Sequence, residues 1–394
     1  MTDVGVIPED WEVKSIGELF SSLRSASITK EMFVEKGCMC VHYGDIHTKY
    51  GRILDCDKDV IPNVPISLCK NYPNVEDGDI IMADASEDLE GVGKCVSVIN
   101  TRGRDIISGL HTILLRDRNN SFYNSFPTYM FSCENVKKGI ESYAVGTKVN
   151  SISYNSIKDC QFCYPSKKEQ QAIADALTMV DNLIMSLSKV IEKKKLIKKG
   201  TMQKLLSGEV RLNGFDGEWE QKTIKDIAVV EKGELLISSQ YENGNIEVWA
   251  GGKVPAGLHN VANRAKNTIT ISASGAYAGF VSYHDCPIFA TDCSTISEST
   301  DFDVKYLYYS LINIQDKIYE MQTGGAQPHV HAKDIYPIEL TMPPTKAEQT
   351  AIAKVLTTTD DEIEALEKER DKYKCIKQGM MQQLLTGKIR LICQ

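Results

Sequence analysis

A spaced group of acidic residues in the first quarter of the chain could do metal-dependent chemistry. The group consists of Asp79, Asp84, Glu87 and Asp88. Nucleases use such carboxylates to hold divalent cations beside a phosphate. No lysine lies on an obvious neighbouring strand to complete a nuclease-like set. We therefore interpret these residues as solvated loop charges.

Other catalytic signatures are missing from the sequence. It contains no G-x-x-x-x-G-K-[ST] loop for nucleotide phosphates and no H-E-x-x-H zinc motif. Gly91-x-Gly93 lacks the third glycine and the βαβ setting of a dinucleotide-binding loop. We predict no catalytic residue and no metal site.

The 12 cysteines raise the question of zinc or disulfides. Cys160 and Cys163 form one C-x-x-C pair, but no second pair or closely spaced histidines complete a zinc site. We predict reduced thiols, mostly buried, that pack as small apolar residues.

Several polar and aromatic side chains have the chemistry to contact base edges. In the first half of the chain these are His42, Tyr43, His47, Lys49, Tyr50 and Arg52. In the second half they are Trp249, Lys253, Ser272, Ser274 and Tyr277.

Net charge argues against strong DNA binding by the chain alone. The formal charge is -8, whereas DNA-binding domains usually carry a basic surface. The basic excess lies in residues 165–212, with 10 basic and 5 acidic residues. Two roles are open for its lysines: they contact DNA phosphates, or they only form a solvent-exposed face of the helix. We expect a protein that needs a partner to close on the duplex.

One long segment occurs twice and must position these residues. Residues 165–212 align without a gap on residues 344–391, and 25 of the 48 positions are identical. Helical composition alone does not produce such identity, so this is an internal duplication.

Both copies of the segment read as long helices. Ser166-x-x-Glu169 and Thr345-x-x-Glu348 are capping boxes, Gly208 and Gly387 are terminators, and Gly200 and Gly379 could kink or interrupt the helices. About 40 helical residues make an arm of about 60 Å. An apolar stripe with steps of four and three predicts a coiled-coil seam in which the helices pair with each other rather than pack on their own domains. It contains Ile173, Leu177, Val180, Ile184, Leu187 and Ile191 in the first copy, and Ile352, Leu356, Ile363 and Leu366 in the second.

A module precedes each helix, and both modules begin alike, at Trp11 and Trp219. These entrances lie 208 residues apart and the helices 179 apart, so the first module is longer by 29 residues. Short β-branched runs such as Thr268–Ser272, with a few helices, predict an α+β fold. The predicted order is module 1–164, helix 165–212, module 213–343 and helix 344–394.

The helical motifs carry a resemblance to a known family. Pro-x-x-x-Glu-Gln-x-x-Ile-Ala opens each helix, and Lys-Lys-Gly-Thr-Met-Gln-Lys-Leu-Leu-Ser-Gly or its counterpart closes it. The exit Gly324-Gly-Ala-Gln-Pro-His-Val-His-Ala-Lys-Asp-Ile and the Trp-x-x-x-x-Ile entrances follow the same pattern. Over its whole length, the chain resembles type I restriction-modification specificity subunits.

The resemblance implies two mixed α/β target recognition domains on two long antiparallel coiled-coil helices, an internal pseudo-twofold repeat. Each domain would read one half of a bipartite double-stranded DNA target. The helices would set the spacing and dock two methyltransferase subunits, which bind S-adenosylmethionine, and two restriction-translocase subunits would join. This chain would bind no cofactor. The module exits add Lys148, Asn150, Gln327 and His329 to the DNA-binding candidates, and Lys148-Val-Asn150 replaces the more usual Gln-Pro-His.

Two alternatives remain at this point. A self-contained methylase would carry an Asn/Asp-Pro-Pro-Tyr/Phe motif for a flipped base, and Met342-Pro-Pro-Thr is not one. A coiled-coil adaptor without sequence-specific DNA binding would suit the acidic modules. Since no apolar run approaches a membrane span and the N-terminus is acidic, we expect a cytoplasmic protein.

Overall fold

The computed structural model describes residues 7–324 and 327–391. Gly325 and Ala326 of the exit motif, and the extreme ends of the predicted segments 1–164 and 344–394, lie outside the described residues. The chain divides into two compact units, one of Met1–Ser186 with Arg370–Gln394 and one of Leu187–Glu369.

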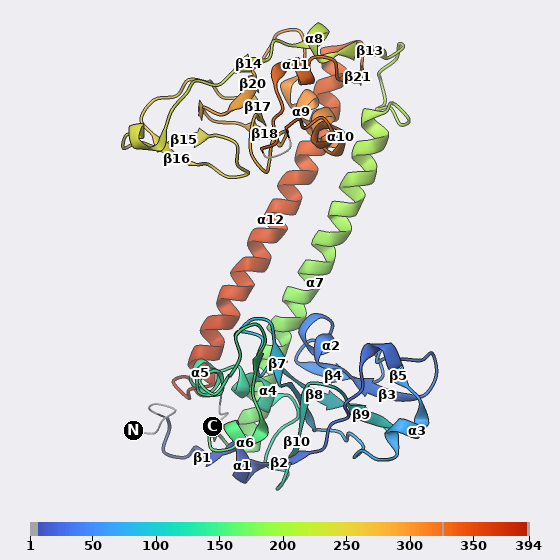
Figure 1. The fold of residues 1–394 in the computed structure, drawn as a ribbon, viewed down its shortest axis with the longest axis vertical. Helices are drawn as coiled ribbons and strands as arrows, with labels where there is room; N and C mark the ends of the chain where they lie inside the picture. Colours follow the sequence, from blue (N-terminus) through green and yellow to red (C-terminus); the bar gives the residue numbers. More distant parts are fainter. Residues whose placement is uncertain (1–6, 325–326, 392–394) are drawn as a thin grey trace. The chain divides into compact units, whose positions relative to one another are not determined.

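Two long helices run through the chain without interruption (Figure 1). Helix α7 spans Lys167–Leu206 and α12 spans Lys346–Leu384. Gly200 and Gly379 lie inside them and do not break them, and a side chain at either position would meet open space. Gly208 and Gly387 follow the helix ends with φ of 75° and 69°, the left-handed conformation of a helix terminator.

The first unit contains a five-stranded sheet, a three-stranded sheet and two short ribbons. The five-stranded order is β2 (Phe20–Leu23), β10 (Thr112–Asp117), β6 (Ile80–Ala83), β8 (Cys95–Ile99) and β4 (Ile53–Asp55). The three-stranded order is β5 (Asn63–Val64), β3 (Cys38–Val41) and β9 (Ile106–Ser108). The ribbons are β1 (Glu12–Ser15) with β12 (Gln161–Tyr164), and β7 (Ala85–Ser86) with β11 (Asn150–Ser151). The short helices are α1 (Ile16–Leu19), η1 (Lys30–Met32), α2 (Tyr43–Thr48), α3 (Ile66–Cys69), α4 (Phe126–Phe131), α5 (Glu134–Glu141) and α6 (Tyr154–Ile157).

The second unit has the same kinds of element. Its larger sheet has the order β14 (Glu231–Lys232), β20 (Cys293–Ile296), β17 (Thr268–Ser272) and β18 (Val281–His284). Its smaller sheet has the order β16 (Gly257–His259), β15 (Ile246–Trp249) and β19 (Phe289–Ala290), and its ribbon joins β13 (Glu220–Thr223) to β21 (Glu339–Met342). The short helices are α8 (Ile224–Ile227), η2 (Ser238–Gln240), α9 (Val304–Asn313), α10 (Gln315–Glu320) and α11 (Ala332–Ile335).

The two modules therefore share one topology although their sequences diverge. In each larger sheet the central strand pairs antiparallel with both neighbours, β6 with β10 and β8, and β17 with β20 and β18. In each smaller sheet one pair is parallel, β3 with β9 and β15 with β19. Part of the extra length of the first module is strand β4, which extends the larger sheet by a parallel pairing with β8.

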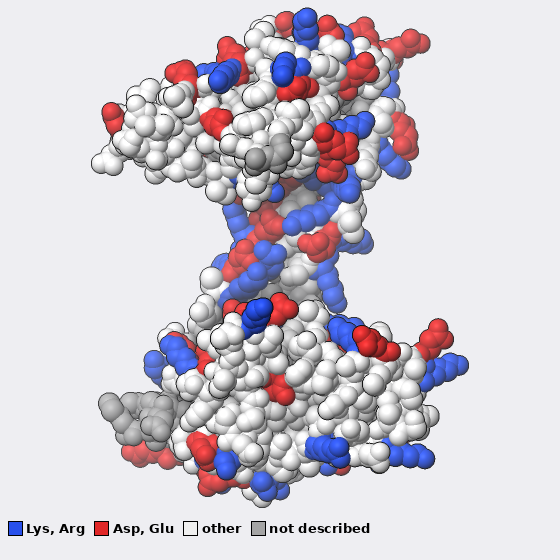
Figure 2. All heavy atoms as spheres, viewed as in Figure 1, with Lys and Arg blue, Asp and Glu red and all other residues white. Residues whose placement is uncertain are grey.

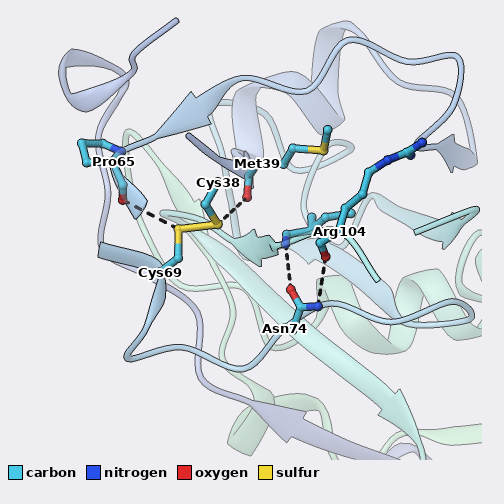
Figure 3. Close-up of a disulfide and its surroundings, with 7 residues drawn as sticks. Cys38, Met39, Pro65, Cys69, Asn74 and Arg104 are labelled. Carbon is cyan, nitrogen blue, oxygen red and sulfur yellow. Dashed lines mark hydrogen bonds between the residues drawn. A yellow bond between two sulfur atoms is a disulfide. The ribbon is translucent and has the colours of Figure 1, made fainter. Parts of the chain in front are cut away.

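The cysteine prediction is wrong for two residues. Cys38 on β3 and Cys69 at the end of α3 form a disulfide, with Cα atoms 6.5 Å apart (Figure 3). Antiparallel pairing of Cys38 with Val64 brings β5, and so the adjoining α3, beside β3. Most of the free cysteines are buried as predicted, but Cys286 and Cys375 are exposed.

No helix among the described residues is long and apolar enough to cross a membrane. The same part of the chain brings no group of three or more His, Cys, Asp or Glu side chains into a metal-binding arrangement.

Candidate nucleic-acid interface

Some of the predicted DNA-binding residues lie at the end of the central strand of each module, such as Asn150 beside Ser86 after β6 and Ser274 after β17. Asp84 follows β6, and its N–H donates to His111 O at 3.1 Å. Ala273 follows β17, and its N–H donates to Asp292 O at 3.2 Å. These two hydrogen bonds occupy the same place in the shared topology, so the two candidate sites are equivalent.

The module exit folds against the same strand end in both units. Ser151 pairs with Val145 and with Ala85 in the first module. His329 pairs with Thr323 and Ser274 in the second. The structural counterpart of His329 is therefore Ser151. The replacement for Gln-Pro-His is Val149-Asn-Ser151, which corrects the assignment to Lys148-Val-Asn150 by one position.

In the first module the predicted aromatic residues form a cluster on α2. The Tyr43 ring lies 4.6 Å from His42 and 6.0 Å from His47. His42 is buried, caps α2 by accepting the Gly44 N–H at 3.2 Å, and has a pKa lowered by that burial. His47 Nε2 donates to Ala85 O at 3.0 Å. The cluster thus lies beside the strand end, with His42 and His47 committed to the protein's own backbone.

Arg52 does not fit its predicted role as a base reader. Its Nη1 donates to Thr128 O at 3.0 Å and also to Ser132 Oγ. Its guanidinium stacks 5.0 Å from the centroid of Tyr129, and its Nε lies 3.7 Å from Asp181 Oδ2. Arg52 therefore ties α4 to helix α7.

Of the remaining candidates of the first module, Lys49, Lys148 and Asn150 are accessible and Tyr50 is not. Lys49 is exposed beside Tyr50, 5.7 Å from its ring centroid, whereas Tyr50 itself is buried. Lys148 is exposed in the exit loop, and Asn150 is half-buried on β11.

In the second module two side chains are held by the protein itself. Trp249 packs beside Ala290 and the His284 ring, and its Nε1 donates to Glu247 Oε2 at 2.9 Å. Ser272 is buried and its Oγ donates to Gly251 O at 3.0 Å, which does not fit a reading role.

The other candidates of the second module have accessible side chains. Lys253 is exposed with its Nζ 4.8 Å from the centroid of Tyr277, a ring that is itself exposed. Ser274 Oγ donates to Asp292, Gln327 is exposed, and the His329 ring stacks 5.6 Å from His331.

Three acidic residues next to β6 and β20 were not predicted as DNA-binding residues; Asp84 and Asp292 lie at the candidate sites, and Asp79 lies at the other end of β6. Asp84, taken as a solvated loop charge, is half-buried beside His111, and Asp292 contacts Ser274. Asp79, also taken as solvated, is 2% exposed and binds Arg116 through both carboxylate oxygens. Strand register brings these partners together, and no local sequence motif signals it.

Each long helix is anchored by a buried glutamate. Glu169 accepts from Arg390 Nε and Nη2 at 2.6 and 2.7 Å, and Glu348 accepts from Arg211 Nε and Nη2 at 2.9 and 2.6 Å. Both helices begin where the capping boxes predicted, but the predicted capping role of the two glutamate side chains is wrong, because their carboxylates bind arginines. Thr345 does cap α12, because its Oγ1 accepts the Glu348 N–H at 3.3 Å.

A second pair of contacts sets the helix register within each unit. Lys377 pairs with Asp181, which also accepts from Tyr129 Oη at 2.9 Å. In the second unit Lys198 lies 2.5 Å from Asp360, which accepts from Tyr309 Oη at 2.7 Å. In the first unit Glu169 and Asp181 bind Arg390 and Lys377 in turn, and in the second unit Lys198 and Arg211 bind Asp360 and Glu348 in turn. In each unit the partner comes earlier in the chain as the first residue comes later, so the two helix segments run antiparallel.

The apolar stripe has two environments, which corrects the prediction of one continuous seam. Ile173 and Leu177 lie in the core of the first module, and Ile352 and Leu356 in that of the second. Further along, Val180, Ile184, Leu187 and Leu366 are half-buried, and Ile191 and Ile363 are buried. The four residues in the module cores cannot contact a partner directly.

A different set of helix side chains faces solvent. The large apolar ones that are exposed are Met179, Leu183, Met185, Val190, Leu196, Ile197, Val355 and Ile376. On the face drawn in Figure 2, basic and acidic side chains intersperse along the helices, and most of the module surface is uncharged.

These features define a class of protein with two α+β recognition modules, each built around one end of a long helix pair. The sequence profile of the type I restriction modification DNA specificity domain matches residues 8–198 and 216–372. The chain belongs to that family, and it supplies DNA sequence specificity rather than catalysis. Family membership decides against the adaptor and methylase alternatives.

Similar proteins cover the chain almost completely. The type I restriction enzyme MjaVIII specificity subunit of Methanocaldococcus jannaschii is 23% identical, over 98% of this chain and 94% of its own. The crystal structure of a type I restriction-modification S subunit from M. genitalium has a TM-score of 0.68 at 19% identity, covering 98% of this chain and 99% of that one. A chain from a study of complex assembly in the type I R-M system has a TM-score of 0.55 at 15% identity, covering 98% and 100%. These likenesses support the fold.

Proposed function

We propose that residues 1–164 and 213–343 each read one half of a bipartite double-stranded DNA target. The observation that carries this proposal is the contrast within the shared topology. The anchors Glu169–Arg390 and Glu348–Arg211 are the same in both units, whereas the strand-end side chains differ. A common frame with different polar loops is what two different half-site specificities require.

The helices of residues 165–212 and 344–394 would fix the half-site spacing and dock two methyltransferase subunits. The exposed apolar residues of α7 and α12, rather than Ile173, Leu177, Ile352 and Leu356, are the surface available for docking. Two restriction-translocase subunits would join this assembly in the cytoplasm. S-adenosylmethionine would be bound by the methyltransferase subunits, and this chain would hold no cofactor.

Base contacts in this proposal come from the accessible candidates. They are Tyr43, Lys49, Lys148 and Asn150 in the first module, and Lys253, Ser274, Tyr277, Gln327 and His329 in the second. His42, His47 and Trp249 would orient the loops, since their polar groups are already bonded within the protein.

The test is to map methylated adenines in DNA from cells that express this chain with its methyltransferase subunits. We expect a single two-part sequence with a fixed gap. Lys253→Ala with Tyr277→Ala should then relax only one half, whereas Lys138→Ala on the surface of α5 should leave both halves unchanged. A methylated sequence without two parts would refute the proposal. Equal loss of base specificity at both halves in the chain with Lys253→Ala and Tyr277→Ala would also refute it.

A further inference from the structure

The strongest unexplained feature is the pair of side chains at Asp84 and His111 in the first module. His111 Nδ1 lies 3.3 Å from Asp84 Oδ1, and the His111 side chain remains 50% exposed. Asp84 Oδ1 is buried, yet no side chain or backbone group in the described residues donates a well-aligned hydrogen bond to it. A buried carboxylate oxygen left in this state costs stability, so its presence calls for a functional explanation.

The backbone at His111 is also unusual. Its φ is 55°, in the left-handed region that side chains other than glycine rarely adopt. The Tyr43 ring packs edge-on against the imidazole at 5.3 Å, and Asp84 N–H holds the His111 carbonyl. Three separate contacts thus fix one exposed imidazole in a strained conformation, a combination found where a side chain is held for binding.

The second module has a different pair at the same place. The counterpart of His111 is Asp292, because each carbonyl accepts the N–H of the residue after the central strand. The Asp292 carboxylate accepts from Ser274 Oγ rather than facing a histidine. The common frame therefore presents an imidazole at one strand end and a carboxylate at the other.

We propose that His111, oriented by Asp84, determines one base of the half-site read by the first module, by accepting a hydrogen bond from the exocyclic amino group of adenine or cytosine in the major groove. The inference rests on the proposed function and names a specificity-determining residue within it.

The chemistry follows from the geometry of the pair. A carboxylate beside Nδ1 favours the tautomer that carries its proton there, which leaves Nε2 as an acceptor on the other side of the ring. In the major groove, adenine N6 and cytosine N4 are amino donors, whereas the corresponding atoms of guanine and thymine, O6 and O4, are acceptors. Asp292 would act alike in the second module, since a carboxylate also accepts from an amino group.

The test compares methylated sequences from cells expressing the methyltransferase subunits with wild-type, His111→Ala, Asp84→Ala or Asp292→Ala chains. We expect His111→Ala to reduce discrimination at one position of one half-site roughly 10- to 100-fold. Asp84→Ala should reduce base discrimination at the same position. A chain that carries both Asp84→Ala and His111→Ala should lose no more discrimination than His111→Ala alone. Asp292→Ala should relax the other half-site.

The outcomes separate this inference from the proposed function. If wild-type chain yields a two-part sequence and His111→Ala yields the same sequence at the same level, the inference is wrong and the proposed function stands. A general loss of methylation without altered base preference would assign the pair a structural role and also overturn it. If the wild-type chain yields no two-part sequence, the proposed function itself fails.

Discussion

Replacing Arg390 with alanine should destabilise the first unit, because it leaves a buried carboxylate unpaired. Glu169 is 2% exposed, and Arg390 donates to both of its oxygens. Arg390 also donates to both oxygens of Asp10, which lowers the pKa of that carboxyl, while the two carboxylates raise the pKa of Arg390.

The size of the effect follows from the burial of Glu169. Breaking a buried pair by removing one partner costs about 3–5 kcal/mol. Since the Arg390 side chain is 26% exposed, water can reach part of the vacated space, and we expect the lower end, about 3 kcal/mol. This corresponds to a roughly 150-fold larger opening equilibrium for the first unit.

Native-state hydrogen exchange of peptides from each unit is the suitable assay, because a chain with two units need not unfold in one step. Protection should fall in α1, α4 and the start of α7 and stay constant around β17. Lys138→Ala, which removes an exposed ion pair with Glu134, is the matched control and should change nothing measurable. Replacing both Arg390 and Glu169 with methionine should recover much of the loss. Unchanged protection in Arg390→Ala, or an equal fall in both units, would refute the reasoning.

Three further predictions concern single residues. Leu356→Ala should cost the second unit about 2–5 kcal/mol in urea unfolding, because the side chain is fully buried, whereas Val355→Ala, at an exposed position of the same helix, should have little effect. Burial lowers the pKa of His284 to about 4, so its contribution to stability is fully present above the unfolded value near 6.5 and is lost as pH falls toward 4, by about 3 kcal/mol; His284→Gln should flatten this pH dependence of unfolding, and an unchanged profile would contradict it. Cys38→Ser should cost the first module about 2–4 kcal/mol, and a reductant should destabilise wild type by the same amount but leave the variant unaffected.

The long helices could be predicted from sequence because both of their signals are local. Apolar steps of four and three, with Gly208 and Gly387 as terminators, define a helix from neighbouring residues alone. The repeat also identified the glutamates at positions 169 and 348 as equivalent. Their partners could not be predicted, because Arg390 lies 221 residues from Glu169 and no short-range pattern links them.

The common topology of the modules was hidden for a different reason. A strand in a sheet requires only residues that fit a pleated, buried surface, so β6 and β17 can fill the same place with Ile-Ile-Met-Ala and Thr-Ile-Thr-Ile-Ser. Which loop residues meet at a strand end depends on register. Arg52 and Ser272 have suitable chemistry for reading bases, but both side chains form hydrogen bonds within the protein, to Thr128 and Gly251.

The proposed role of the helices in setting the half-site spacing is tested most directly by changing their length. Four residues inserted after Ile191 in α7 and four after Glu367 in α12 lie at one level of the second unit, because Lys194 pairs with Glu362 and Lys195 with Glu367. The addition lengthens both helices by about 6 Å, close to one or two base-pair steps. Mapping of methylated adenines should show both half-sites unchanged and the gap longer by one or two base pairs. An unchanged gap with normal methylation would contradict the account.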